Sequence, residues 1–301
     1  MLKKNKKEKE PKEIKKAKKV KKKVVEEPQY YTSHTNMPTY NYHVYNMPKK
    51  EKRLCFLSGF VAGAALGFLF YGGLGKDQFG NPTIVTYVLN ILIPLIVGLI
   101  FGKKFIPIRT SAIVQKRKTE LAKQFRDFLD SLATSIGVGK NVNDGLYSVY
   151  EDLKQQYEPS AFIIQELEVI LDGLRNNIQI EELFEDLGKR SSNDDIKNFA
   201  NVFKVSYRKG ANIKEVLKNT HKILSDKMSI SEEIETTLTS NKTEQNVMFI
   251  APVILVALIK FMSPDFATNF ATPAGIISTT IGIIIFYFSY RIGKEVLEIK
   301  I

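Results

Sequence analysis

The sequence contains one cysteine, three histidines and no tryptophan. Because Cys55 has no second cysteine to pair with, an intrachain disulfide is excluded. The sequence also lacks the G-x-x-x-x-G-K-[ST] phosphate loop, the H-E-x-x-H zinc motif and any Cys/His cluster with zinc-ligand spacing. We therefore expect no catalytic residue, no metal site and no cofactor, and interpret the chain as a protein that is not an enzyme.

Charged residues are absent from four long stretches of the chain. A run of about 20 apolar residues is long enough to cross the hydrocarbon core of a bilayer. The stretches predict four membrane spans, at residues 54–74, 83–101, 247–262 and 272–290. The third span is the shortest and carries Lys260 near its far end, where a lysine side chain can extend to the interface.

These spans divide the chain into a tail, two hairpins and a polar module between the hairpins. We expect a disordered Lys/Tyr-rich tail at 1–53, a first hairpin at 54–102, a cytoplasmic helical domain at 103–246, and a second hairpin with a short cytoplasmic tail at 247–301. The two loops on the opposite side carry almost no Lys or Arg. The positive-inside rule therefore predicts a multi-pass protein of the cytoplasmic (inner) cell membrane, with both termini and the module in the cytoplasm.

The N-terminal tail is strongly basic. Its first 23 residues contain 13 Lys and three Glu, and so carry most of the formal net charge of +12. Such a tail can bind nucleic acid, attract anionic lipid headgroups or remain a solvated segment that sets topology, and we favour the last. Five tyrosines follow without a helical or strand period, and the sequence leaves open whether they form an interaction motif: Tyr30, Tyr31, Tyr40, Tyr42 and Tyr45.

The first span contains three glycines at strict four-residue spacing, Gly59, Gly63 and Gly67. This spacing places them along one face of a helix, where small residues let a second helix approach closely. We expect this face to pack on a neighbour, either in the same chain or in another copy.

The polar module has a helical pattern and an internal repeat. Two of its turns are alike, with Gly139 followed by Asn141 and Gly210 followed by Asn212, and a weaker third copy runs through Asn177. Glycine tolerates the left-handed conformation that ends a helix, and the asparagine two residues later can cap the next helix. Three such units predict a six-helix bundle. The predicted fold class is an all-α membrane protein, in which two pairs of transmembrane helices flank a cytoplasmic bundle of helix-turn-helix repeats.

The stripes of apolar residues at helical spacing predict the core of this bundle. They run through Leu121, Phe125, Phe128, Leu129, Leu132 and Ile136, through Phe162, Ile163, Leu167, Ile170, Leu171 and Leu174, and through Ile196, Phe199, Ala200, Phe203 and Tyr207. Two acidic groups on these helices raise the alternative of a cation site, but solvated helix faces are favoured. The groups are Asp127 with Asp130, and Glu166 with Glu168 and Asp172.

The repeat units read F-x-x-x-[LF]…G-x-N-[VI]-x-x-x-L, and together with the paired spans they resemble the type II secretion system F family (T2SSF domain). The nearer resemblance is to the tight-adherence (Tad) pilus assembly protein B branch. It rests on the loop of the second hairpin, which reads Met-Ser-Pro-Asp-Phe and then Ala-Thr-Pro-Ala-Gly, and on the short basic and apolar tail at 291–301, which ends Glu-Ile-Lys-Ile. The matching motif positions are Pro264, Asp265, Thr272, Pro273 and Gly275.

The resemblance covers residues 121–301, with Asn177 in place of a usual turn glycine. It implies a platform protein of the inner membrane that couples a cytoplasmic secretion ATPase to the extraction and assembly of pilin subunits. It also implies a homo-oligomer or hetero-oligomer, partnership with another F-family platform protein and contact with membrane lipid, with no nucleic acid as a partner. The residues matched to the family motif and to the turns are expected to shape the scaffold rather than to perform chemistry.

Two other functions fit the same layout. One is a membrane-anchored signalling adaptor whose helical cytoplasmic domain binds a partner. The other is a protein that tethers nucleic acid to the membrane through its lysine-rich tail.

Overall fold

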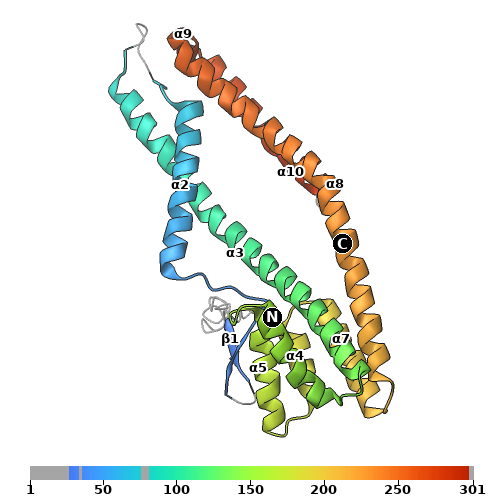
Figure 1. Cartoon of the computed structure of the whole chain (residues 1–301). Helices are drawn as coiled ribbons and strands as arrows, with labels where there is room; N and C mark the ends of the chain where they lie inside the picture. Colours follow the sequence, from blue (N-terminus) through green and yellow to red (C-terminus); the bar gives the residue numbers. More distant parts are fainter. Residues whose placement is uncertain (1–26, 34–35, 76–80, 298–301) are drawn as a thin grey trace, which may run out of the picture.

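The computed structural model describes residues 27–33, 36–75 and 81–297. Helices dominate this part of the chain, with one small two-stranded sheet near its N-terminal end (Figure 1). The strands are β1 (Tyr30–Thr32) and β2 (Pro38–Tyr40). The helices are α2 (Lys49–Tyr71), α3 (Ile84–Gly137), α4 (Val142–Gln156), α5 (Phe162–Arg175), α6 (Ile180–Arg190), α7 (Asp194–Arg208), α8 (Ile213–Met262), α9 (Pro264–Asn269) and α10 (Pro273–Leu297).

Four of these helices, α2, α3, α8 and α10, are long and apolar enough to cross a membrane. Each expected span falls on one of these helices. The helix α2 ends at Tyr71, three residues before the expected end of the first span at residue 74. Figure 1 shows α2 with the start of α3, and α10 with the end of α8, as two hairpins at one end of the molecule. The shorter helices α4 to α7 gather at the other end, whereas the six-residue helix α9 lies at the hairpin end.

The helices α3 and α8 each run without interruption from a hairpin into the group of shorter helices. They contain 54 and 50 residues, so α3 is about 80 Å long at 1.5 Å per residue. Pro94 and Pro107 lie inside α3 and Pro252 lies inside α8, yet neither helix ends there. Both apolar segments are therefore joined to the rest of the molecule by continuous helix.

One hydrophobic core holds the shorter helices together with the inner ends of α3 and α8. Most of the apolar residues that the helical stripes predicted for the core are buried, with Leu121 the first of them on α3. Ile136, Phe162 and Leu174 are partly buried against this core, whereas Tyr207 is 37% exposed and stacks on the Phe203 ring. On α8 the buried residues end at Leu224. Aromatic rings fill the centre, and Phe184 contacts Phe199 and Phe203 edge-on with ring centroids 5.4 and 4.9 Å apart. About 19 residues of α3 and about 22 residues of α8 separate this core from the apolar segments, distances of about 28 and about 33 Å.

The N-terminal segment differs from the expected disordered tail. In its described part, β1 pairs with β2 in antiparallel register, and α2 begins at Lys49. Tyr42 is only 1% exposed and belongs to the hydrophobic core cluster. The expectation of disorder is wrong here because a tyrosine can bury its ring and still hydrogen-bond through its hydroxyl. Residues 1–26, which carry the lysine-rich tail, lie outside the described residues.

Candidate functional site

The repeated turns have the backbone conformation that helix ends require. Gly139 and Gly210 have φ values of +92° and +66°, and Asn177 has +58°. A Cβ added to either glycine would meet nothing within 4 Å. Glycine is therefore required by the backbone conformation and not by crowding.

The asparagines after these glycines cap the next helices. The Asn141 side chain accepts a hydrogen bond from the Asp144 N–H at 2.8 Å, and Asn212 accepts one from the Glu215 N–H at 3.4 Å. These bonds satisfy donors that would otherwise be unpaired in the first turns of α4 and α8. In the third copy, Gln179 precedes α6 and makes no side-chain cap bond.

The three glycines of α2 face α3 of the same chain. A Cβ on Gly63 would lie 2.6 Å from the Phe101 Cβ, and one on Gly59 would lie 2.8 Å from the Phe105 Cβ. Gly67 faces Pro94 and Val97 at 3.1 and 3.2 Å. The neighbour that the sequence left open is thus intramolecular.

The close approach also depends on two glycines of α3 that the sequence reading did not single out. A Cβ on Gly98 would lie 2.9 Å from the Phe60 carbonyl oxygen, and one on Gly102 would lie 3.0 Å from the Phe56 carbonyl oxygen. They form a second G-x-x-x-G pair, which was the available signal.

The loop motif of the second hairpin builds the start of α10. Thr272 accepts a hydrogen bond from the Gly275 N–H at 3.1 Å and donates one to the Asn269 carbonyl at 2.7 Å. Pro273 is the first residue of α10, a position that needs no N–H. A side chain at Gly275 would collide with the Asn269 carbonyl oxygen. Pro264 and Asp265 lie at the start of α9, and their side chains, like residues 298–301, lie outside the described part of the chain.

A buried ion pair at the core contradicts the expectation of a solvated acidic face. Glu166 on α5 and Arg190 at the end of α6 have side chains only 2% and 6% exposed. Their two hydrogen bonds are 2.9 and 2.7 Å long, a bidentate arrangement. Glu166 lies between Ile163 and Ile170 on the buried face, so the stripe that predicted the core also included this carboxylate.

The ion pair anchors the strap, which we define as residues 36–48, comprising β2 and the segment that joins β2 to α2. The Tyr42 hydroxyl donates to Glu166 at 3.0 Å, and its backbone N–H donates to the Arg190 carbonyl at 3.0 Å. Arg190 also donates to the Tyr40 carbonyl at 3.0 Å. Burial, followed by the charge of Glu166, raises the pKa of Tyr42 well above its ordinary value. The strap is thus fastened to the core by a neutral tyrosine.

Farther along, the strap also contacts α3. The Arg117 guanidinium lies over the Tyr45 ring, 4.4 Å from its centroid. The Tyr45 hydroxyl donates to Glu51 at 2.6 Å. Three of the five tyrosines whose role the sequence left open therefore hold the N-terminal segment in place, namely Tyr40, Tyr42 and Tyr45.

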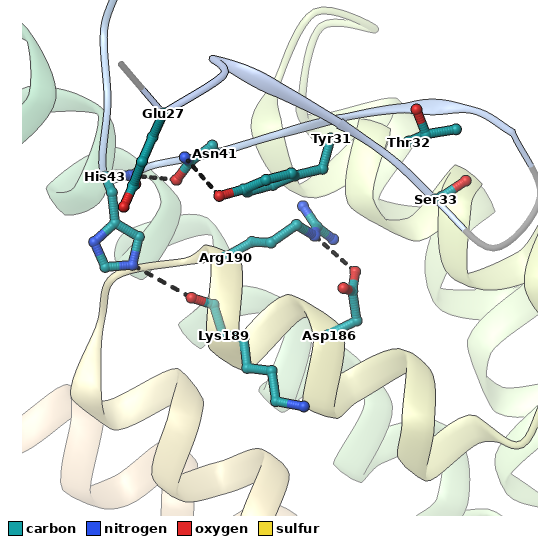
Figure 2. Close-up of a pocket in the computed structure, with 9 residues that line it drawn as sticks. All are labelled: Glu27, Tyr31, Thr32, Ser33, Asn41, His43, Asp186, Lys189 and Arg190. Carbon is teal, nitrogen blue, oxygen red and sulfur yellow. Dashed lines mark hydrogen bonds and ion pairs between the residues drawn. The ribbon is translucent and has the colours of Figure 1, made fainter. Parts of the chain in front are cut away.

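A polar pocket of about 470 Å³ lies between this N-terminal segment and α6 (Figure 2). His43 lies 3.4 Å from the Lys189 carbonyl oxygen, and Arg190 donates to Asp186 at 2.6 Å. Figure 2 shows these groups, together with Asn41 and Tyr31, directed toward one another. The cations of this pocket are neutralised by neighbouring carboxylates, because Lys189 pairs with Glu185 at 2.8 Å.

Three of the other acidic residues considered for a cation site, Asp127, Glu168 and Asp130, lie beside protein partners. Asp127 accepts a hydrogen bond from Tyr157, and burial together with this bond raises the pKa of Tyr157 to about 12. Glu168 accepts one from Tyr150 at 2.9 Å. Asp130 lies 3.9 Å from the His221 ring. Within the described residues, no group of three or more His, Cys, Asp and Glu has an arrangement that could hold a metal ion.

An apolar cleft of about 720 Å³ lies between the two hairpins. Each of the four long helices contributes an aromatic side chain to its wall, namely Phe70, Phe101, Phe249 and Phe286. Two polar contacts join the hairpins near the ends that lie farthest from the helical core. The Lys260 ammonium donates to the Leu69 carbonyl at 2.7 Å, and the Tyr71 and Thr280 hydroxyls lie 3.0 Å apart.

Comparison with known proteins identifies no relative, because no family model, curated protein or solved structure matches the chain. The structure alone therefore defines the class, a helical protein with four helices long and apolar enough to cross a membrane.

Proposed function

We propose that this chain is a platform protein of a type II secretion or Tad-type pilus assembly machine in the cytoplasmic membrane. In this role it couples a cytoplasmic secretion ATPase to the extraction and assembly of pilin subunits. The observation that carries the proposal is the repeated helix-turn-helix unit between two apolar hairpins, with α3 and α8 continuous from the hairpins into the core.

The continuous helices suit a protein that transmits movement. A helix resists bending far more than a loop does, so a displacement of the core is passed to the hairpins through α3 and α8. The buried core and the capped turns keep the helical module rigid as a unit. In this proposal the module is a cytoplasmic six-helix bundle that the ATPase contacts.

The charge distribution supports the orientation in this proposal. Lys103, Lys104 and Arg109 follow the apolar part of α3, and Arg291 follows that of α10, all on the side of the helical core. The positive-inside rule then places the core and both termini in the cytoplasm. A homo-oligomer, or a hetero-oligomer with a second F-family protein, completes the platform.

The test is cross-linking in the native cell followed by purification of the tagged full chain. We expect a secretion ATPase and a pilin to be enriched together and identified by mass spectrometry. The matched control is a chain with Arg190→Met, which loosens the core while leaving all four long helices intact. Recovery of a kinase or response regulator, without ATPase or pilin, would instead support the signalling adaptor.

A further inference from the structure

The cleft between the hairpins is too small for a transmembrane helix. A helix about 10 Å in diameter that crosses a core of about 30 Å occupies about 2,400 Å³. The cleft has about 720 Å³, within the range of about 300 to 1,000 Å³ that is common for pockets that hold small organic ligands. Its size therefore favours narrow hydrocarbon chains over a protein helix.

The dimensions and wall of the cleft suit the acyl chains of a lipid. Its lining on α10 runs from Thr279 to Tyr290, which is about 16 Å of helix, or about half of the hydrocarbon thickness. Gly282 leaves room between the aromatic side chains of the lining. A Cβ added to Gly282 would meet nothing within 4 Å.

The two ends of the cleft differ in a way that orients such a lipid. At the end far from the helical core, the Lys260 ammonium joins the hairpins by donating to the Leu69 carbonyl, and it lies over the Phe270 ring of its own hairpin. Toward the helical core, Lys104 lies one turn beyond Phe101, a cleft-lining residue, and Arg291 follows Tyr290. Both basic side chains are exposed. Arg291 shares its charge with Glu295, 3.4 Å away in an exposed ion pair of the kind that contributes little in water, so this end can still offer positive charge to a headgroup phosphate.

We propose that the cleft binds the acyl chains of an anionic phospholipid from the leaflet on the side of the helical core, with its headgroup at Lys104 and Arg291. The lipid fills the space between the hairpins and joins them where they share few direct contacts. This proposal concerns a binding site and does not depend on the platform function.

The test is native mass spectrometry of the full chain in mild detergent, titrated with phosphatidylglycerol or phosphatidylcholine of equal chain length. The wild type is expected to bind phosphatidylglycerol more tightly. Gly282→Phe places a ring in the cleft and should weaken that binding at least tenfold. The control Ser278→Phe, at an exposed position of α10 outside the lining, should leave it unchanged.

A second variant tests the headgroup contacts without filling the cleft. Replacing both basic residues, as Lys104→Gln with Arg291→Gln, should weaken phosphatidylglycerol binding about thirtyfold, from about 1 kcal/mol per cation. Phosphatidylcholine binding should change little. Equal phosphatidylglycerol binding by the Gly282→Phe and Ser278→Phe variants would overturn the cleft as the site. Equal binding of the two lipids by the wild type would overturn the proposed headgroup recognition.

Discussion

The buried pair of Glu166 and Arg190 gives the sharpest prediction about stability. Arg190→Met keeps an unbranched apolar stem but removes both hydrogen bonds to Glu166, the bond to Asp186 and the bond to the Tyr40 carbonyl. The Glu166 carboxylate, whose side chain is 2% exposed, is then buried without its cation. Breaking a buried pair in this way costs about 3–5 kcal/mol.

The assay is native-state hydrogen exchange of the full chain in mild detergent, read by mass spectrometry. A loss of about 3 kcal/mol or more in the free energy of unfolding speeds the exchange of backbone amides at least about a hundredfold, wherever exchange requires the core to open. We expect this acceleration in the peptides of α5, α6 and the strap, which the pair connects. The double variant Arg190→Met with Glu166→Leu should recover part of the loss, because no charge is then left unpaired in the core.

A neighbouring lysine provides the control. Lys189 has a side chain 67% exposed and pairs with Glu185 at 2.8 Å, so Lys189→Met should cost about 0–1 kcal/mol. If Arg190→Met were no more costly than Lys189→Met, the buried pair would not be what fastens the strap to the core.

Three further predictions concern the glycines and the charged surface. Gly63→Leu should lower the thermal midpoint of the detergent-solubilised chain, because a Cβ at this position would lie 2.6 Å from the Phe101 Cβ. Overpacking of this kind costs about 1–3 kcal/mol. An unchanged midpoint would show that α2 and α3 do not pack as described. Gly210→Ala, at φ +66°, should destabilise the core by about 1–2 kcal/mol in urea unfolding. The same change at Gly137, the last residue of α3, should be neutral or stabilising because the φ of Gly137 is not positive. Equal effects of the two substitutions would contradict the turn geometry. Hydrogen bonds from Lys189 and Lys204 lower the pKa of Glu185 from its ordinary 4.5 to about 2. The stability that this pairing contributes is therefore present above pH 4.5 and lost as the pH falls toward 2, and Lys204→Met should reduce the acid-induced loss measured by circular dichroism.

The long helices and the core could be predicted because their signals are periodic and extend over many residues. The stripe from Leu121 to Leu132 repeats every three or four positions and is buried in the structure. The turns could be predicted because few residues besides glycine tolerate a positive φ, so that Gly139 and Gly210 stood out at equal offsets from their caps.

The strap and the ion pair could not be predicted in the same way. The strands β1 and β2 have three residues each, too few to establish a period. Tyr42 of the strap contacts a residue 124 positions away in the sequence. The partner of Glu166 lies 24 positions away on a different helix. Helical periodicity reports which face is buried but not which distant residue neutralises a charge on it, although a carboxylate inside an apolar stripe signals that some partner exists.

The most direct test of the platform function is electron microscopy of surface filaments in a strain that lacks this gene and encodes no second copy. The proposal predicts that the deletion strain makes pilin but assembles no filament, and that the wild-type gene supplied on a plasmid restores assembly. Normal numbers and lengths of filaments in the deletion strain would contradict it.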